Sequence, residues 1–580
     1  MKVLFFAPHS ATWIHAFPEA LVAEALEEHG DEIVYVGCGR TLRSHCVSMS
    51  AYSVPFSAPA EQKSRICALC EKNLAIIRGR FGFAGPDLSA LVTDGDLAAA
   101  EQMLVSTPPE NHVDLVLDGV EVGRIALYEL LIQSKRATLD FNEEERARYR
   151  ASLKNVIVVL RTAQRLLDDL RPDRIVLYNA LYSVNRAVCR LAELRGVPQY
   201  FLHAGENLSH RLETLVFAKD QAFSYYRHLR SQWPRFEHRP CPAEAMRAAT
   251  DHLLEVAKGR SAWAYSAASG NRADLRKAFG IRDGQKVICA TMSSDDERFG
   301  AEIVGVLPPT AGLLYAKQVD WIRALVGYVE ARPELCLVIR VHPREFPNKR
   351  EGVLSDHARL LKEAFANLPA NARINWPTEN VSLYDLAAIT DVFANGWSSA
   401  GKEMSLLGLP VVLYSPQFVL YPPSLNYVGT STAGYFAEIE RALADGWSIE
   451  RTRRTFRWNA VEYHYASLDI SDSFSRDEHA PFLAKALRRV IRSIAPTLQQ
   501  QSDCRRRSKS LSAGGKMSEV LHGQLNSVVD LEVPASAVSL AEETECLKRE
   551  VGRLVDGLFG PGGDPRTNPL AAKLRSFAGS

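Results

Sequence analysis

Short apolar runs alternate with longer helical patterns through the first part of the chain. The run at 2–8 reads as a buried strand, and a helical pattern over 17–30 follows it. The other apolar runs lie at 33–36, 113–117, 174–178 and 199–202, and further helical patterns cover 150–170 and 183–195. Strands that alternate with helices predict a mostly parallel sheet covered on both faces.

A second series with the same alternation begins after a segment that lacks strands. Its apolar runs lie at 286–291, 337–341, 391–395 and 411–414, separated by helical patterns around 317–331, 356–367 and 399–407. A chain of 580 residues exceeds what one core usually organises. We therefore predict two α/β domains, over 1–255 and 276–496, joined by a linker at 256–275 that includes Ser266-Ala-Ala-Ser-Gly-Asn271.

The last part of the chain changes character from about 497. A polar, arginine-rich stretch runs over 499–510, and glycine and proline gather at 560–565. We expect most of 497–580 to be disordered, as a C-terminal tail. A helix near 540–559 is the exception, because Leu547, Val551, Leu554 and Leu558 have helical spacing. This helix is expected to dock on the body or on a partner.

Charge and hydropathy exclude several classes of protein. The 69 basic and 68 acidic residues give a formal net charge of +1, so the broad basic surface of a nucleic-acid binder is not expected. No apolar run is long enough to span a membrane, and the N-terminus lacks the pattern of a signal peptide. These features predict a cytoplasmic protein that holds any anionic ligand locally.

Four of the ten cysteines lie close together in the sequence, at Cys38, Cys46, Cys67 and Cys70. A Cys-x-x-Cys pair can place two thiolates on one metal, and the upstream pair could complete a tetrahedral site. The site would hold a structural zinc ion, or an iron–sulfur cluster on the same ligands. His45, next to Cys46, could replace one of the cysteines as a ligand. Four free thiols are the alternative interpretation.

Two strand ends carry residues suited to phosphate. The run 338–345 delivers His342 to the end of a strand, with Arg344 beside it, and both side chains could donate to phosphate oxygens. The segment 391–403 runs from a strand through Gly396, Ser398 and Ser399 into a helix, a pattern that can seat phosphate at free backbone N–H groups. A histidine in a simple turn and ordinary N-capping by serine are the structural alternatives.

Taken together, the two segments resemble a known family. The order strand, His-Pro, about 55 residues, strand, Asn-Gly-x-Ser-Ser, helix and Gly408-Leu-Pro410 is similar to the C-terminal half of bacterial capsule and surface-polysaccharide glycosyltransferases. Teichoic-acid glycerophosphotransferases and bacterial sialyltransferases with a His-Pro motif share that layout. The resemblance covers roughly 285–420 with motifs. It implies a GT-B fold, in which two Rossmann-like, doubly wound domains face each other across a cleft.

The resemblance also implies roles for individual residues. His342, Ser398 and Ser399 would contact the phosphates of a nucleotide-sugar donor, and Glu403 would contact the donor's ribose or sugar. Related sialyltransferases take their base from an acidic pair followed by glycine. The nearest match here is Ser294-Asp-Asp-Glu297, which lacks the glycine, with Asp295 or Asp296 as the candidate base.

The N-terminal domain would then bind the acceptor and supply a general base. Residues expected near the cleft follow or precede predicted strands, and each has a purely structural alternative. They are His9, His15, Asp118, Glu121, His203 and Glu206.

The sequence thus predicts transfer of a sugar from a nucleotide sugar to a polysaccharide or glycolipid in bacterial surface-polysaccharide synthesis. Such an acceptor is compatible with peripheral association at the inner face of the membrane. No divalent catalytic metal is required, since no Asp-x-Asp clamp occurs in a suitable place. A sugar-nucleotide 2-epimerase or a glycerophosphotransferase of the same fold is the enzymatic alternative. A non-catalytic scaffold, with the cysteines and tail as interaction modules, is the alternative of another class.

Overall fold

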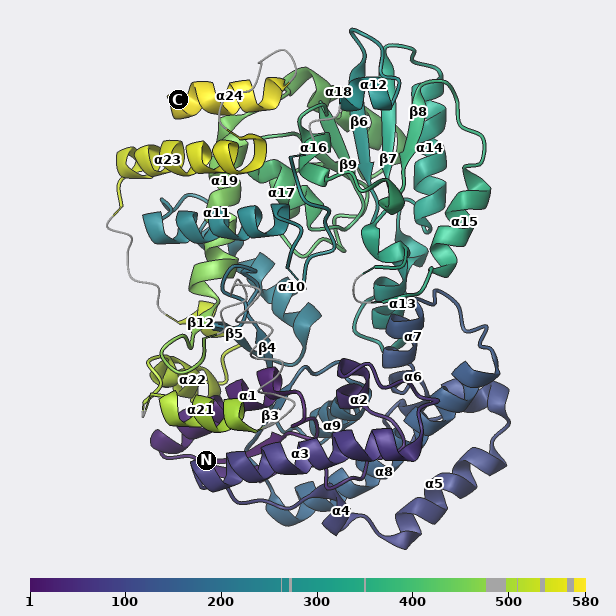
Figure 1. Ribbon diagram of the computed structural model, residues 1–580, viewed down its shortest axis with the longest axis vertical. Coiled ribbons are helices and arrows are strands. Elements are labelled where there is room, and N and C mark those ends of the chain that lie inside the picture. The colour runs from purple at the N-terminus through teal and green to yellow at the C-terminus, as the bar shows by residue number, and fades with distance from the viewer. Residues whose placement is uncertain are drawn as a thin grey trace.

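The chain folds into two α/β halves, each built around a six-stranded sheet (Figure 1). The computed structural model describes residues 1–580 except 262, 271–273, 349–350, 476–496, 509, 532–537, 561–567 and 580.

The N-terminal sheet has the order β12-β5-β4-β3-β1-β2. Its strands are β1 (Lys2–Phe6), β2 (Glu32–Val36), β3 (Arg174–Tyr178), β4 (Gln199–Ala204), β5 (Thr214–Lys219) and β12 (Leu468–Asp469). The strands β1 to β4 are parallel, whereas β5 runs antiparallel to both β4 and β12. The sheet reverses its winding between β1 and β3, which makes the ends of these strands a favoured place for ligands.

The C-terminal sheet is entirely parallel and has the order β11-β10-β9-β6-β7-β8. Its strands are β6 (Lys286–Thr291), β7 (Leu335–Arg340), β8 (Ala372–Asn375), β9 (Val392–Asn395), β10 (Val411–Leu413) and β11 (Tyr427–Val428). The winding reverses between β6 and β9. Thr291 pairs with Arg340 of β7 and with Asn395 of β9, so the segments that follow these three strands emerge side by side.

Helices cover both sheets, as expected when apolar strands are buried on two faces. In the N-terminal half they are α1 (Trp13–Glu28), α2 (Val47–Ala51), α3 (Ala60–Phe81), α4 (Leu88–Leu91), α5 (Asp94–Ser106), α6 (Val122–Ile125), α7 (Tyr128–Ser134), α8 (Glu143–Leu170), α9 (Ser183–Leu194), α10 (Ala222–Gln232) and α11 (Ala243–Ala257). The long α8 begins with a capping box between Asn142 and Glu145, which satisfies two backbone N–H groups at its start.

The C-terminal half has a similar cover. Its helices are α12 (Leu275–Ala278), α13 (Asp295–Ile303), α14 (Gln318–Glu330), α15 (Asp356–Ala364), α16 (Leu383–Ala387), α17 (Ala400–Leu406), α18 (Thr432–Asp445) and α19 (Ile449–Ala460). A π-helical turn at Val461–Tyr465 continues α19 toward the N-terminal half. Short 3-10 turns occur at Pro109–Asp114, Trp233–Arg235, Thr310–Gly312, Pro343–Glu345, Pro377–Glu379, Pro423–Leu425 and Val528–Asp530.

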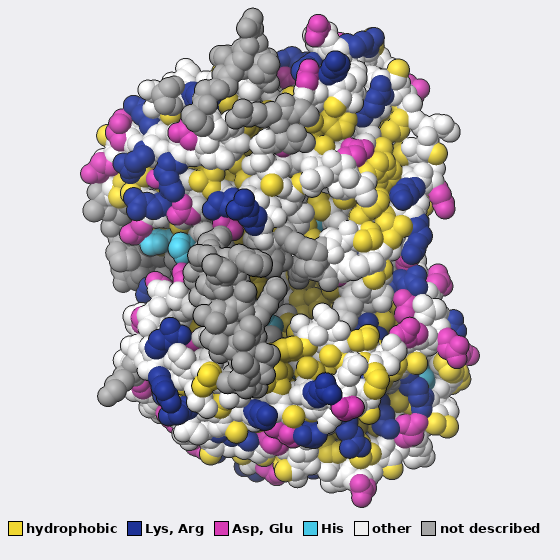
Figure 2. All heavy atoms as spheres, viewed as in Figure 1, with side chains coloured by type: hydrophobic (Ala, Val, Ile, Leu, Met, Phe, Trp, Pro, Cys, Tyr) yellow, Lys and Arg dark blue, Asp and Glu magenta, His cyan; other side chains and the backbone are white. Residues whose placement is uncertain are grey.

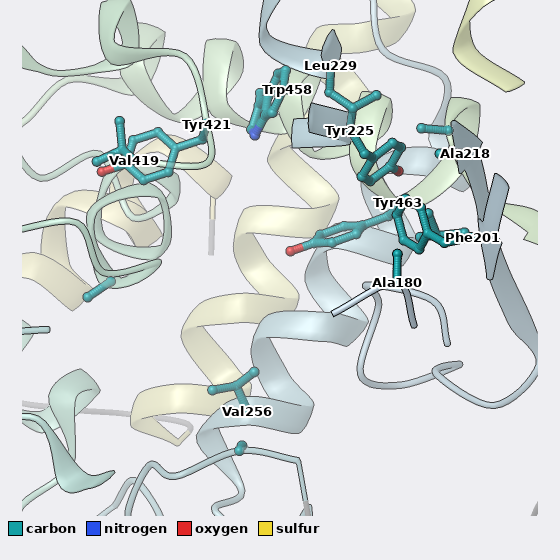
Figure 3. Packing of buried hydrophobic residues seen from close by; sticks show 14 of the residues in the cluster. Ala180, Phe201, Ala218, Tyr225, Leu229, Val256, Val419, Tyr421, Trp458 and Tyr463 are labelled. Atoms are coloured by element: carbon teal, nitrogen blue, oxygen red, sulfur yellow. The ribbon is translucent and has the colours of Figure 1, made fainter. Parts of the chain in front are cut away.

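One hydrophobic cluster runs continuously from one half into the other. Figure 3 shows its central part, where Phe201 of β4 and Tyr225 of α10 lie near Tyr463, and Trp458 of α19 lies toward Tyr421. The rings of Trp233 and Trp458 meet edge to face, with centroids 5.9 Å apart. This shared core fixes the two halves against each other and thereby fixes the geometry between their strand ends.

Four C-terminal helices pack on the body: α21 (Leu498–Arg506), α22 (Gly514–His522), α23 (Leu540–Phe559) and α24 (Pro569–Ala578). The predicted helix near 540–559 is confirmed as α23, which docks on α11 and α24, while α22 packs on α1 (Figure 1). The fully buried carboxylate of Glu543 fastens α23, because Arg457 contacts it at 2.7 Å and Arg453 at 2.9 Å. The expected disorder of the tail therefore does not extend to these four helices.

The predicted fold class, two doubly wound α/β domains, is confirmed, and most predicted strands lie within two residues of the observed ones. The strand predicted at 113–117 is wrong: a 3-10 turn occupies Pro109–Asp114, and Leu117 makes only an isolated bridge to Val120. Strands β5, β8, β11 and β12 were not predicted. No helix in the described part of the chain is long and apolar enough to cross a membrane.

Candidate functional site

A cavity of about 260 Å³ lies between the two halves, at the ends of β6, β7 and β9. On the face shown in Figure 2, hydrophobic side chains gather on the right of the upper half and occur in smaller groups over the lower half, while basic and acidic side chains are interspersed over both. The wall contributed by residues 291–403 includes Thr291, Met292, Arg340, His342, Pro343, Leu383, Ser398, Ser399, Ala400, Lys402 and Glu403. The remaining lining residues are Glu206, Leu208, Arg211, His252, Val256, Trp263, Ala264, Tyr265, Ser266 and Tyr463.

His342 follows β7 and lines this cavity, as its position after a strand predicted. The backbone N–H of Arg344 donates to its Nδ1 at 3.3 Å. Burial lowers the pKa of His342 to about 4, so the ring is neutral at pH 7. Because Nδ1 accepts, the single proton of the neutral ring lies on Nε2, which makes that atom a hydrogen-bond donor.

Ser398 and Ser399 line the same cavity and have different hydrogen bonds. The Ser398 hydroxyl oxygen accepts from the N–H of Ala400 at 3.2 Å, which leaves its own proton available for another acceptor. The Ser399 hydroxyl donates to Glu403 at 2.8 Å, and Tyr384 donates to the other oxygen of that carboxylate, also at 2.8 Å. Ser398 is therefore a potential ligand donor, while Ser399 and Tyr384 hold Glu403 in place.

Two glycines in this segment act through close packing. The predicted ligand residue Gly396 does not line the cavity; its N–H donates to Thr291 and its carbonyl accepts from Ser415. Gly401, not predicted, lies so close to Tyr421 that a Cβ there would be 1.9 Å from the Tyr421 hydroxyl oxygen. The predicted role of Gly396 in ligand binding is thus corrected to a structural role. The helix that follows this segment, α17, is short, with seven residues.

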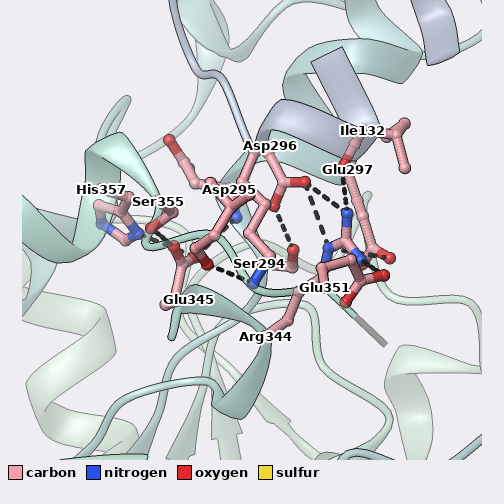
Figure 4. A network of polar contacts seen from close by, with 12 residues as sticks. Ile132, Ser294, Asp295, Asp296, Glu297, Arg344, Glu345, Glu351, Ser355 and His357 are labelled. Carbon is pink, nitrogen blue, oxygen red and sulfur yellow. Dashed lines mark hydrogen bonds and ion pairs between the residues drawn. The ribbon is translucent and has the colours of Figure 1, made fainter. Parts of the chain in front are cut away.

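The prediction that Arg344 binds phosphate is also corrected. Its guanidinium is 2% exposed and does not line the cavity; it lies instead in the network of Figure 4. It contacts Asp296 at 2.8 Å, Glu351 at 2.9 Å and the carbonyl of Ile132 at 2.6 Å. Because Ile132 belongs to α7 of the N-terminal half, Arg344 ties the two halves together rather than facing a ligand.

The acidic pair Asp295 and Asp296 lies in that network and not in the cavity. Asp296 is 1% exposed and accepts from Ser294 at 2.7 Å in addition to its ion pair with Arg344. Asp295 accepts from Gln318 at 3.3 Å. Neither carboxylate is placed to deprotonate a ligand in the cavity, so the base expected from the sialyltransferase pattern is not at these positions.

Among the base candidates of the N-terminal half, Glu206 alone is part of the cavity wall within the described residues. His15 stacks on Tyr178 with ring centroids 4.1 Å apart, and burial lowers its pKa to about 3. His203 lies near the same tyrosine and is likewise neutral, with its pKa lowered to about 4 by burial. Thus the prediction of His15 as a catalytic residue is not supported by its position.

His9 lines a second, smaller cavity inside the N-terminal half, together with Glu129, Arg148 and Ser183. It follows β1 at the switch point of that sheet. Both of its ring nitrogens are buried without a hydrogen-bond partner in the described structure.

Asp118 and Glu121 are far from the cavity, which corrects their prediction as bases. Asp118 is exposed in the tight turn between Leu117 and Val120, where Gln164 of α8 donates to it at 2.6 Å. Arg190 near the end of α9 contacts Glu121 at 3.3 Å. Helix α9 begins at the carboxyl ends of the strands, which face the cavity, and runs back along the sheet. Because Arg190 lies near the end of α9, its partner Glu121 lies toward the opposite edge of the sheet.

Several residues of the cavity wall were not predicted from the sequence. Trp263 and Tyr265 lie in the segment predicted to be a linker, and two aromatic residues in such a segment were a usable signal. Arg211 and His252 gave no signal, because they lie in a loop and in a helix that only the tertiary fold brings to the cavity. Lys402 lies in α17 and forms a buried ion pair with Glu462.

The cysteine cluster does not form a metal site in the described residues. Across those residues, no group of three or more His, Cys, Asp and Glu side chains is placed to hold one ion. Cys46, Cys67 and Cys70 instead pack with Ala11, Met49 and Ile66, and the N–H of Ala11 donates to the Cys70 sulfur at 3.2 Å. Burial raises the pKa of Cys38 to about 12 and that of Cys70 to about 11, so these thiols stay protonated. The four cysteines are free thiols in this structure.

Comparisons with known proteins give only distant structural likeness. No protein-family model and no curated protein matches the chain. UDP-GlcNAc 2-epimerase from Neisseria meningitidis is 12% identical, with a TM-score of 0.27 over 80% of this chain and 97% of its own. KpsC, a beta Kdo 2,4 transferase of Thermosulfurimonas dismutans, is 15% identical, with a TM-score of 0.32 over 52% and 82%.

A third similar structure is CalG4, the calicheamicin glycosyltransferase, at 13% identity and a TM-score of 0.26 over 79% of this chain and 94% of that one. Likeness at this level carries no argument about activity, which must come from the site itself.

Proposed function

We propose that the chain is a glycosyltransferase of the GT-B type that moves a sugar from a nucleotide-sugar donor to a polysaccharide or glycolipid acceptor. One observation carries the proposal: His342, Ser398 and Arg340 converge on one cavity from the ends of β7 and β9, the two strands that flank β6 in the parallel sheet. Strand ends at a switch point are where such sheets bind ligands, and all three side chains donate hydrogen bonds.

The proposed phosphate site combines one charge with neutral donors. Arg340 is 6% exposed and has no carboxylate within ion-pair distance among the described residues; its Nη1 donates to Asn375. Ser398 and the Nε2 of His342 add neutral donors. A buried cation without a counter-ion is unfavourable, and a phosphate would supply the missing charge.

These groups would act on the leaving phosphate. As the bond between the sugar and the phosphate oxygen breaks, negative charge grows on that oxygen, and preorganised donors stabilise it. We propose that Glu403, held by Ser399 and Tyr384, accepts a hydrogen bond from a hydroxyl of the donor's ribose or sugar. The charge on the phosphate is then met by protein groups, and a divalent cation is not required.

Glu206 is the proposed general base. It is the acid that the N-terminal half places in the cavity wall, opposite His342 and Ser398. A base on that wall would accept the proton of the acceptor hydroxyl as it attacks the anomeric carbon. This assignment replaces the predictions at His15 and Asp118.

The test is incubation of the purified full chain with nucleotide sugars of several bases and sugars. Protection against thermal unfolding reports binding, and release of free nucleotide in the presence of glycan acceptors reports transfer. Transfer to an acceptor supports the proposal. Interconversion of epimers without an acceptor would instead assign a 2-epimerase, and glycerophosphate transfer would assign that chemistry.

A matched pair of variants separates the site from the fold. Ser398→Ala removes the free hydroxyl donor of the cavity, whereas Ser431→Ala removes a serine cap at the start of α18, outside the cavity. Only the first is expected to weaken nucleotide binding. Absence of protection by every nucleotide would contradict the proposal and favour a scaffold.

A further inference from the structure

The cavity contains a second cation that the proposed phosphate site does not use. Arg211 lies in the loop between β4 and β5 and lines the wall opposite His342 and Ser398. No carboxylate lies within 4.0 Å of its guanidinium anywhere in the described structure. Lys402, by contrast, has its charge matched by Glu462. The cavity thus has two unmatched arginines, Arg340 on one wall and Arg211 on the other.

Arg211 is held in one orientation before any ligand binds. Its Nη1 donates to the Gly205 carbonyl at 3.0 Å, and its own carbonyl accepts from the Gly205 N–H, also at 3.0 Å. The Trp263 ring covers the guanidinium, with 5.2 Å between Cζ and the ring centroid. A fixed side chain loses little conformational entropy when it binds, so this loop is preorganised for a ligand.

The unused edge of the guanidinium is the one suited to a carboxylate. Because Nη1 is engaged, the pair Nε and Nη2 remains, and these two N–H groups form the fork that matches two carboxylate oxygens. The Nε atom is buried with no hydrogen-bond partner in the described residues. An unpaired buried donor is costly, and an acceptor from a ligand would offset that cost.

The acids in the cavity wall, and Glu462 beside it, do not neutralise this edge. Glu403 accepts from Ser399 and Tyr384, and Glu462 is paired with Lys402. Glu206 lies beside the Tyr226 hydroxyl and forms no ion pair with Arg211. The charge at Arg211 is therefore left for a ligand that carries one negative charge.

We propose that Arg211 binds the carboxylate of an acidic sugar, through Nε and Nη2, on the wall opposite the phosphate site. This inference rests on the proposed function and narrows its substrate class to sugars that carry a carboxylate. The carboxylate belongs either to the sugar of the donor or to the acceptor. One guanidinium carries a single positive charge, which a monoanionic carboxylate neutralises, whereas a doubly charged phosphate ester would keep one charge unmatched at this wall.

The experiment uses ligand pairs that differ only in the carboxylate. The donor pair is UDP-glucuronate and UDP-glucose; the acceptor pair is an oligosaccharide of galacturonate and one of galactose, each with UDP present. Free glucuronate and free glucose form a third pair that needs no nucleotide. Affinity is measured by calorimetry or ligand-observed NMR. We expect the acidic member of at least one pair to bind roughly tenfold more tightly.

Three variants make the test specific. Arg211→Met should abolish the preference, Arg211→Lys should keep a weaker one because the charge remains without the fork, and Arg227→Met on the exposed face of α10 is the matched control. Binding of UDP alone should stay within about twofold in Arg227→Met.

Each failure has its own signature. Protection by nucleotides without any preference for the acidic members would overturn this inference and leave the proposed function intact. A preference that survives in Arg211→Met would overturn it as well. If no nucleotide binds, the proposed function fails, and the pair of free sugars still decides whether Arg211 recognises a carboxylate.

Discussion

Arg344 donates its backbone N–H to Nδ1 of His342 over 3.3 Å, while its side chain is not part of the cavity wall that His342 lines. One residue thus orients the ring in the site with its main chain and joins the two halves with its guanidinium. The relationship fixes the proton of the neutral imidazole on Nε2 and leads to the first two predictions.

His342→Ala is expected to lower the rate of sugar transfer by about 10²- to 10³-fold, as loss of one preorganised donor does in other sites. Thermal stability should change little, because the ring is partly exposed to the cavity. The measurement is the rate of nucleotide release in the presence of acceptor. His210→Ala, at an exposed histidine outside the cavity, is the control. Full activity in His342→Ala would refute the proposed role.

Arg344→Met is expected to destabilise the protein by about 3 to 5 kcal/mol, because it leaves the buried Asp296 without its partner. Urea unfolding gives the free energy. Nucleotide affinity, measured at a temperature where the variant is folded, should stay within about threefold of the wild type. A selective loss of nucleotide affinity with unchanged stability would restore the phosphate-binding role that the sequence suggested.

Acid should unfold the protein through its buried neutral histidines. Burial lowers the pKa of His9 to about 4 from 6.5. A depressed folded-state pKa gives stability that is present above 6.5 and is lost as the pH falls toward 4. The loss from His9 is about 2 kcal/mol at pH 5. Melting temperatures between pH 7 and 4.5 test this, and His9→Phe should flatten the curve, whereas exposed His210→Phe should not.

Glu543→Ala should release α23 from the body. The change leaves Arg457 and Arg453 without their shared carboxylate, and the N–H of Cys241 loses its acceptor. We expect a destabilisation of about 3 to 5 kcal/mol and early protease cleavage near 540–559. Glu545→Ala, on an exposed acid of the same helix, is the control. Equal protease resistance in the two variants would contradict the docking role.

Gly401→Ala should disturb the site through packing. Its Cβ would lie 1.9 Å from the Tyr421 hydroxyl oxygen and 2.7 Å from Nδ2 of Asn395, which itself holds the Ser398 carbonyl. We expect loss of stability by about 1 to 3 kcal/mol and weaker nucleotide binding. Tyr421→Phe in the same chain removes the clashing oxygen and should recover part of both. If neither recovers, the clash with Nδ2 of Asn395 causes the loss of stability and binding.

The sequence predicted the parallel cores because their strands are short, continuous apolar runs such as β3, where all five residues are buried. It missed β8 and β11, which are short edge strands: Arg373 and Ile374 in β8 and both residues of β11 are only partly buried. The run at 113–117 misled because a partly apolar run can also cover a core without joining a sheet.

Within the site, His342 and Ser398 were predicted because strand ends are local features of the sequence. Arg344 was misassigned because nothing in the sequence shows which way a side chain turns after a strand. Arg211 and Trp263 could not be predicted together: their stacking depends on contacts that only the folded chain creates. The same holds for the thiols, whose spacing resembles a metal site although their sulfurs face an apolar cluster.

The pairing of β12 with β5 has a consequence for folding during synthesis on the ribosome. While residues 220–467 are still being translated, β5 has an open edge, and α1 lacks the cover that α22 later gives it. An exposed strand edge invites pairing with a neighbouring nascent chain. The N-terminal sheet is thus synthesised first but gains its last strand, β12, only after most of the chain has been translated. Truncated chains that stop before β12 should therefore depend on chaperones or aggregate.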